Sequence, residues 1–264
     1  MSKRMRTEKG PRPSRTGWLR RQQTRQRGKG RLRSRNALVS VPRGKLAFPQ
    51  EMRTKLRYVE TFDLEPTSST AAGFSILANG MYDPEVGVGG HQPRGFDQYT
   101  ALYQKFTVKS SKISVTFAYE GYNGPAGFLS TGGPSQAIYA KDVNDQAAVP
   151  SAICLVHKSV ETNDTGTIES FQERDRTKWK SITPGGEVKT VSTGLTCGQF
   201  FGKDFLVGAD GYTGTDSTDP DNKLYYHVMC GLNSNEYPRQ INVRANCIVE
   251  YDVVWTEPKQ LAAS

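Results

Sequence analysis

The chain has 264 residues, among them 35 Lys and Arg and 26 Asp and Glu, which gives a formal net charge of +9. About 220 residues outside a basic leading segment suit one large domain. No apolar run approaches about 18 residues, and the basic N-terminus lacks the apolar stretch of a secretory signal, so we expect neither membrane insertion nor secretion.

Positive charge is concentrated in the first 45 residues. That segment holds sixteen basic residues and one acid, Glu8, a net +15, whereas residues 46 to 264 carry a net −6. It has too few large apolar side chains to offset the backbone entropy of folding, so we predict a disordered basic arm at 1–45 and one folded domain at 46–264. A solvated tail without a specific partner is the alternative.

The arm has the chemistry of a nucleic-acid ligand. The Arg fork matches phosphate oxygens, and Trp18 can stack on an unpaired base. Basic runs of this kind also serve as nuclear-import signals. The predicted nucleic-acid-binding residues are Lys3, Arg4, Arg6, Lys9, Arg12, Arg15, Trp18, Arg20, Arg21, Arg25, Arg27, Lys29, Arg31, Arg33, Arg35, Arg43 and Lys45.

The first half of the folded domain alternates between two periods. Apolar residues at every second position predict strands at 56–64 and 112–119, and a short apolar run predicts another at 72–78. Between them, aromatic residues from Phe96 to Phe106 recur every three to four positions, which predicts a helix of two or three turns. Residues 121–150 are rich in Gly, Pro and Ala and predict an extended surface loop.

The second half repeats the strand theme. Apolar or mixed runs predict strands at 152–157, 177–182, 188–195 and 224–232. The clearest pattern places apolar residues at odd positions from Ile241 to Trp255. This run is long for one strand, so we expect a bulge or bend near Ile248. About eight strands with few helices predict an all-β fold, a two-sheet sandwich or jelly roll.

Motifs for catalysis are missing from the sequence. There is no nucleophile elbow, no Walker loop and no H-E-x-x-H. His91, His157 and His227 are far apart in the chain, and His227 fits a hydrogen-bonded packing residue. We therefore predict no enzyme activity, no catalytic residue and no cofactor.

The sequence also contains no clear motif for a metal site or a redox site. Cys154, Cys197, Cys230 and Cys247 form no C-x-x-C pair, so we interpret them as free thiols packed in the core. The Asp210, Asp216, Asp219 and Asp221 cluster offers oxygens to calcium but lacks the EF-hand spacing, so a solvated acidic loop is the preferred interpretation. No metal site is predicted.

The segment from Leu77 to Val108 carries a family resemblance. It contains Tyr82-Asp83-Pro84, then Gly90-His91-Gln92-Pro93, Phe96-Asp97 and Leu102-Tyr103, and ends at Phe106-Thr107-Val108. In this order the phrases resemble a stretch in capsid proteins of circular, Rep-encoding single-stranded DNA viruses, the circovirus-like group. The basic arm and the strand count agree with that family at lower specificity.

The resemblance implies a single eight-stranded jelly-roll β-sandwich that self-assembles into a small icosahedral shell of 60 subunits (T=1). It also implies that the arm packages a circular single-stranded DNA genome, and that host import receptors carry the protein to the nucleus before it enters the virion. We expect Tyr82, Pro84, Gln92, Pro93, Phe96, Asp97 and Tyr103 to act in folding or subunit contacts. The alternatives are a nucleic-acid-binding protein that forms no shell, or a jelly-roll capsid protein that packages RNA.

Overall fold

The computed structural model describes residues 49–67, 70–87, 90–123, 151–163, 166–204, 206–233 and 240–260. No helix within these ranges is long and apolar enough to cross a membrane. The elements follow one another as β1 (Glu51–Leu64), β2 (Ala72–Leu77), α2 (Phe96–Thr100), β3 (Tyr103–Asn123), β4 (Ala152–Ser159), α4 (Ile168–Gln172), β5 (Thr177–Ile182), β6 (Lys189–Thr196), α5 (Cys197–Phe201), β7 (Tyr225–Leu232) and β8 (Gln240–Pro258).

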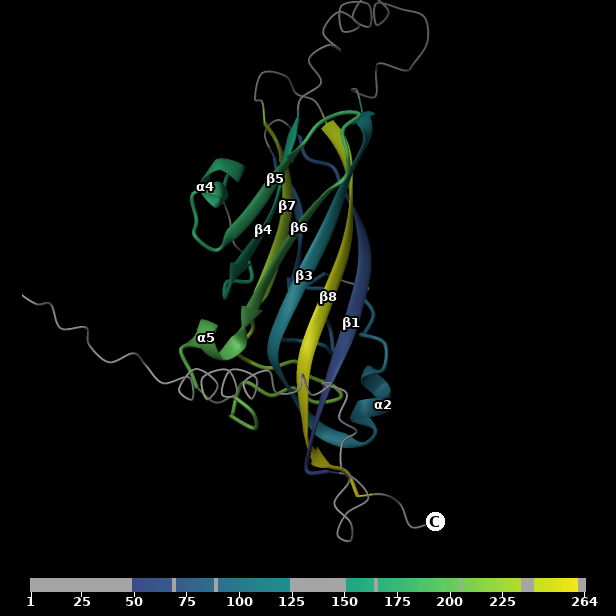
Figure 1. Cartoon of the computed structure of the whole chain (residues 1–264), viewed down its shortest axis with the longest axis vertical. Helices are drawn as coiled ribbons and strands as arrows, with labels where there is room; N and C mark the ends of the chain where they lie inside the picture. Colours follow the sequence, from purple (N-terminus) through teal and green to yellow (C-terminus); the bar gives the residue numbers. More distant parts are fainter. Residues whose placement is uncertain are drawn as a thin grey trace, which may run out of the picture. The chain divides into compact units, whose positions relative to one another are not determined.

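The eight strands form two antiparallel sheets of four. Sheet A has the order β1-β8-β3-β6 and sheet B the order β2-β7-β4-β5. Figure 1 shows sheet A and sheet B as two layers, with α2 beside β1 and α4 beside β4 and β5. Because each strand of one sheet is followed along much of the chain by a strand of the other, this order is that of a jelly roll. The predicted all-β fold and strand number are confirmed.

The alternation of buried and less buried side chains along β8 shows which face of sheet A covers the core. Its odd-numbered residues from Ile241 to Trp255 are all buried, because a strand turns successive side chains to opposite faces. The matching face of β3, with Ile113, Val115 and Phe117, is buried as well. Together with the inward faces of β4 and β7 they fill one core between the sheets.

The expected bulge near Ile248 is wrong. β8 pairs with β1 without interruption from Glu51 opposite Thr256 to Leu64 opposite Val243. The two register shifts lie in β3 instead, between Val108 and Ser110 and between Tyr119 and Gly121. β8 has a neighbour on both sides along nearly its whole length, so an extra residue there would disturb two ladders. β3 pairs with β6 only from Ser110 to Phe117, and both shifts fall outside that stretch.

The predicted helix from Phe96 to Phe106 is also wrong in extent. α2 has five residues and ends at Thr100, and the chain enters β3 at Tyr103. From Tyr103 onward the chain pairs with β8, and these hydrogen bonds favour a strand although the aromatic spacing is that of a helix. β3 therefore begins nine residues earlier than the predicted strand at 112–119 and includes 121–123 of the predicted loop. The rest of that loop, 124–150, lies outside the described residues.

Candidate functional site

The predicted nucleic-acid-binding residues and Trp18 all belong to residues 1–45, which lie outside the described residues. Their role stays a prediction. The second nominated set, from Tyr82 to Tyr103, lies in the described segment that leaves β2 and returns to the sandwich as β3.

The start of this segment is held by backbone hydrogen bonds and one carboxylate. The Leu77 N–H donates to the Pro84 carbonyl oxygen at 2.7 Å, which closes a compact turn. The backbone N–H groups of Tyr82 and Asp83 donate to the two carboxylate oxygens of Asp219 at 2.9 and 3.1 Å. Burial raises the pKa of Asp219 above its usual value, although these hydrogen bonds oppose that shift. Asp219 is therefore a structural anchor, and for this residue the interpretation as part of a solvated loop is wrong.

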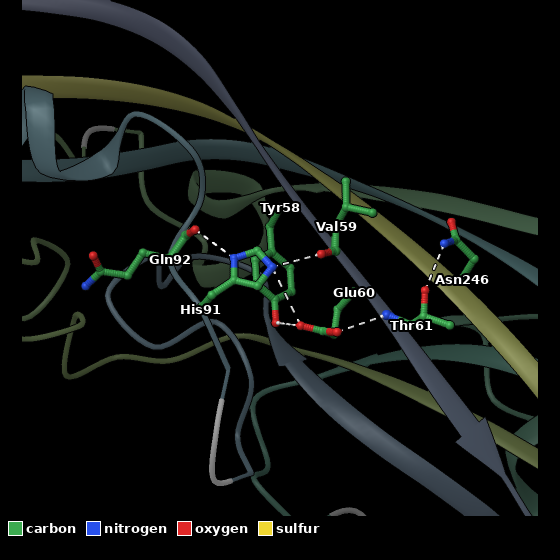
Figure 2. Close-up of polar contacts among 7 residues, drawn as sticks. All are labelled: Tyr58, Val59, Glu60, Thr61, His91, Gln92 and Asn246. Atoms are coloured by element: carbon green, nitrogen blue, oxygen red, sulfur yellow. Dashed lines mark hydrogen bonds and ion pairs between the residues drawn. The ribbon is translucent and has the colours of Figure 1, made fainter.

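Farther along the segment, His91 ties the loop to β1 (Figure 2). Its ring lies 4.7 Å from the ring of Tyr58, centroid to centroid. Nδ1 lies 2.9 Å from the Gln92 carbonyl oxygen, and Nε2 lies 3.0 Å from the Val59 carbonyl oxygen. A carbonyl oxygen only accepts, so both contacts are hydrogen bonds only when both ring nitrogens carry a proton.

Glu60 supplies a negative charge beside this ring. Its Oε2 lies 3.6 Å from His91 Nε2 and 3.4 Å from the hydroxyl oxygen of Tyr58. The carbonyl acceptors and this carboxylate raise the pKa of His91, the Gln92 carbonyl most of all. Glu60 interrupts the apolar alternation of β1 because it serves this polar cluster at the edge of the core.

The end of the segment is anchored in aromatic packing. Phe96 of α2 meets Phe106 of β3 edge-on, with ring centroids 5.6 Å apart, and both contact Trp255 of β8. Tyr99 stacks on Trp255 at 5.2 Å. The hydroxyl of Tyr103 donates to the Pro49 carbonyl oxygen at 3.0 Å. The aromatic period that suggested a longer helix instead places these rings around Trp255.

The nominated residues therefore divide by burial. Pro84, Pro93, Phe96 and Tyr103 are buried, in keeping with a folding role. Gln92 is half-buried, Asp97 is exposed, and Tyr82 is 39% exposed. Residues 92–98 line a surface depression of about 580 Å³. The exposed members of the set are available to a neighbouring molecule.

The histidines show why separation in sequence is a poor guide to separation in space. His157 of β4 lies directly opposite His227 of β7, with ring centroids 6.4 Å apart. Nothing in the local sequence suggested that this pair would meet. His227 Nδ1 lies 2.6 Å from Ser75 Oγ and Nε2 lies 2.9 Å from the Glu161 carbonyl oxygen, so its predicted hydrogen-bonded packing role is confirmed.

The four cysteines are free and buried, as predicted. The Sγ atoms of Cys154 and Cys230 lie 3.3 Å apart across β4 and β7. Their contact, with burial, raises the pKa of Cys154, and burial alone raises the pKa of Cys197 to about 12. Thiols in this state are poor nucleophiles. Within the described ranges, no three His, Cys, Asp or Glu side chains gather where they could hold a metal ion.

The sequence interpretation missed a group of cations at one edge of the sandwich. Lys112, Lys158 and Arg176 come from three separate segments and line a common groove near α5. The one signal visible in the sequence is the run Lys178-Trp179-Lys180, which alternates basic and aromatic residues on β5.

No protein-family model matches the chain, and no curated protein matches it. Solved viral structures are similar to it at low identity. A mud crab tombus-like virus structure has a TM-score of 0.38 and 9% identity over 99% of this chain and 95% of that chain. The decameric BFDV capsid protein has a TM-score of 0.38 and 8% identity over 78% of this chain and 99% of that chain. Desmodium yellow mottle tymovirus has a TM-score of 0.33 and 12% identity over 98% of this chain and all of that chain. At TM-scores this low, the jelly-roll assignment rests on the strand order.

Proposed function

We propose that this chain is a viral capsid protein that self-assembles into a small icosahedral shell and packages a circular single-stranded DNA genome through its basic N-terminal arm. The observation that carries the proposal is a jelly-roll strand order directly preceded by a segment of net charge +15. The resemblance of residues 77–108 to circovirus-like capsid proteins supports DNA as the cargo.

The charge distribution fits a division of labour. The domain from residue 46 onward carries a net −6, so it is suited to contacts between subunits more than to general binding of nucleic acid. In a shell of 60 subunits, arms of +15 would bring about 900 positive charges to the genome, enough for about that many phosphates. Binding through the arm would be insensitive to base sequence, because phosphate contacts position the protein without specifying the base. It would also weaken steeply with salt.

The site geometry agrees with a structural role for the 77–108 segment. Asp219, His91 and the rings around Trp255 fix three parts of it to the sandwich. The exposed side chains of Tyr82 and Asp97 are then held at defined positions, as a contact between subunits requires. We propose these two residues as subunit contacts, and the remaining nominated residues as their support.

The same arm is proposed to carry a nuclear-import signal recognised by host import receptors, which would place the protein in the host nucleus before it enters the virion. The test is cellular. A fluorescent fusion of the full chain is expected in the nucleus, and a fusion with the basic residues of 1–45 replaced by Gln in the cytoplasm. Equal nuclear signal from both would contradict the import function and leave assembly untouched.

Assembly and packaging are tested by electron microscopy with a nuclease-protection assay, on the full chain and on a chain lacking residues 1–45. We expect uniform shells from both and protected nucleic acid only from the full chain. Extraction of protected strands, followed by DNase and RNase digestion, identifies the cargo. If neither chain forms particles at any salt concentration while the full chain still binds single strands, a nucleic-acid-binding protein that forms no shell becomes the better account.

A further inference from the structure

A groove of about 600 Å³ opens where the free edges of the two sheets approach each other, next to α5. β6 is an edge strand of sheet A and β5 an edge strand of sheet B. The walls of the groove come from β6, β3, β4, α5 and the turn before β5. Its lining combines three cations with small hydroxyl side chains: Lys112, Lys158 and Arg176 with Ser111, Ser192, Thr193 and Thr196.

The cations are held in position by contacts within the fold. Lys158 continues the inward-facing positions of β4 after Cys154 and Val156, so it reaches across the gap between the sheets. Its Nζ donates to the Gly194 carbonyl oxygen of β6 at 3.2 Å. The guanidinium carbon of Arg176 lies 4.2 Å from the centre of the Phe200 ring of α5. The Lys158 N–H also donates to the Arg176 carbonyl oxygen at 3.3 Å, so the two residues lie side by side at the groove.

Two of these cations, Lys158 and Arg176, form no ion pair with a carboxylate among the described residues. Elsewhere on the sandwich Arg57, Lys105 and Arg244 each form an ion pair with a carboxylate. Within the described part of the chain, neither Lys158 nor Arg176 lies within ion-pair distance of one. Burial lowers the pKa of Lys158, and the nearby charges of Lys178 and Arg176 lower it further. An anion relieves the repulsion among like charges around a half-buried lysine, and a phosphate group also accepts hydrogen bonds from hydroxyl groups.

The adjoining edge strand identifies the kind of anion. On β5, Lys178 pairs with Val156 and Trp179 with Leu155, so the lysine turns toward the gap between the sheets and the tryptophan toward the outer face. Because β5 is an edge strand, a ligand lying along it can reach both sides. Trp179 is 49% exposed, unlike Trp255, which is fully buried. An exposed aromatic ring among cations is how proteins bind single-stranded nucleic acid, by base stacking beside phosphate contacts.

We infer that the groove and the β5 edge form a second nucleic-acid site, on the folded domain itself, in which Lys158, Arg176 and Lys178 contact phosphates and Trp179 stacks on a base. This inference rests on the proposed packaging function and adds to it. The arm supplies most of the neutralising charge, and the site on the domain fixes a short stretch of strand against each subunit.

The test uses the full chain and a labelled oligothymidylate of about 20 nucleotides, with affinity measured at several salt concentrations. The groove variant carries Lys158→Gln, Arg176→Gln and Lys178→Gln. The control carries Arg53→Gln, Lys55→Gln and Arg94→Gln, the same charge change at three exposed residues outside the groove. Loss of three phosphate contacts on a single strand makes the log–log salt slope less negative by about 2. We expect that change in the groove variant and a much smaller one in the control.

Trp179→Ala tests stacking at unchanged charge. We expect a loss of affinity of about 5- to 150-fold, and near-normal affinity for Trp179→Phe. In the unaltered chain, an oligonucleotide containing bromodeoxyuridine is expected to photo-crosslink within residues 177–180. This measurement needs no variant, so it decides the matter even if a substitution impairs folding.

Three results would overturn the inference. Equal salt slopes for the groove variant and the control would show that Lys158, Arg176 and Lys178 do not contact phosphates. Weaker binding of dextran sulfate by the groove variant, with unchanged oligonucleotide affinity, would assign the groove to a sulfated polysaccharide. Failure of Trp179→Ala to form particles, with unchanged affinity, would make Trp179 a subunit contact. In each case, nuclease protection that depends on the arm would still uphold the packaging function, whereas its absence would refute that function separately.

Discussion

Replacement of Trp255 by Ala should cause one of the largest losses of stability available in this fold. Trp255 is fully buried, its ring contacts those of Phe96, Tyr99 and Phe106, and its Nε1 donates to Thr54 Oγ1 at 2.7 Å. Truncation of a buried Trp to Ala costs about 3 to 5 kcal/mol. In a domain of this size each kcal/mol lowers Tm by about 2 to 4 °C, so a decrease of about 6 to 20 °C is expected.

Trp255→Phe separates packing from the hydrogen bond. It keeps a ring in the cluster but leaves Thr54 Oγ1 without its donor, so we expect a loss of about 1 to 2 kcal/mol. Val188→Ala is the control, because Val188 is 60% exposed and its truncation should change stability by less than about 0.5 kcal/mol. The assay is thermal unfolding of the purified chain followed by far-ultraviolet circular dichroism.

Hydrogen exchange gives a local measure of the same effect. Trp255→Ala should speed exchange in residues 96–106 more than in β4 or β7, because α2 and the start of β3 pack on this ring. A decrease in Tm no larger than that of Val188→Ala, or exchange accelerated equally throughout, would refute the view that Trp255 anchors the segment.

Three further predictions follow from the described contacts. The contribution of His91 to stability should be complete below its unfolded pKa of about 6.5 and be lost as pH rises through its raised folded pKa. Hydrogen exchange in residues 90–93, corrected for intrinsic rates, should therefore be slower at about pH 5.5 than at about pH 8.5. His91→Gln should remove that difference. Gly231→Ala should destabilise the protein by about 1 to 3 kcal/mol in chemical denaturation, because the added Cβ would lie 2.2 Å from Ile168 Cγ1; a neutral result would show that α4 shifts freely. Cys154 and Cys230 should react with iodoacetamide only as fast as the protein unfolds, and rapid alkylation without unfolding would contradict their burial.

Strand positions could be predicted from the sequence where one period dominates. The alternation from Ile241 to Trp255 gave β8 almost to its ends, because every odd residue faces the core. For the segment from Phe96 to Phe106 the length of the helix was predicted wrongly, because a helix and a turn into a strand both bring aromatic residues to one side. Only the partner strand β8 decides between them, and pairing between residues so far apart in the chain leaves no local signal.

The contacts that hold the candidate site depend on distant partners in the same way. His91 meets the Val59 carbonyl 32 residues away, and Asp219 meets the Tyr82 N–H 137 residues away. The composition of the acidic cluster indicated solvation, whereas Asp219 is partly buried because its carboxylate accepts from the backbone of the turn at Tyr82 and Asp83. The groove cations were missed for a related reason. Lys158 and Arg176 become neighbours when β4 pairs with β5, and Lys112 of β3 joins them only when the two sheets pack together.

The place of β8 in sheet A has a consequence for biosynthesis. β1 and β3 are not bonded to each other, because β8 lies between them and joins both. A ribosome that has made the first seven strands has therefore produced two long strands of sheet A with no partner between them, and the core face that Trp255 and its neighbours complete is still open. Closure of the sandwich waits for the last strand to leave the exit tunnel. A chain that stops before β8 therefore leaves β1 and β3 unpaired with each other and the core exposed on that side.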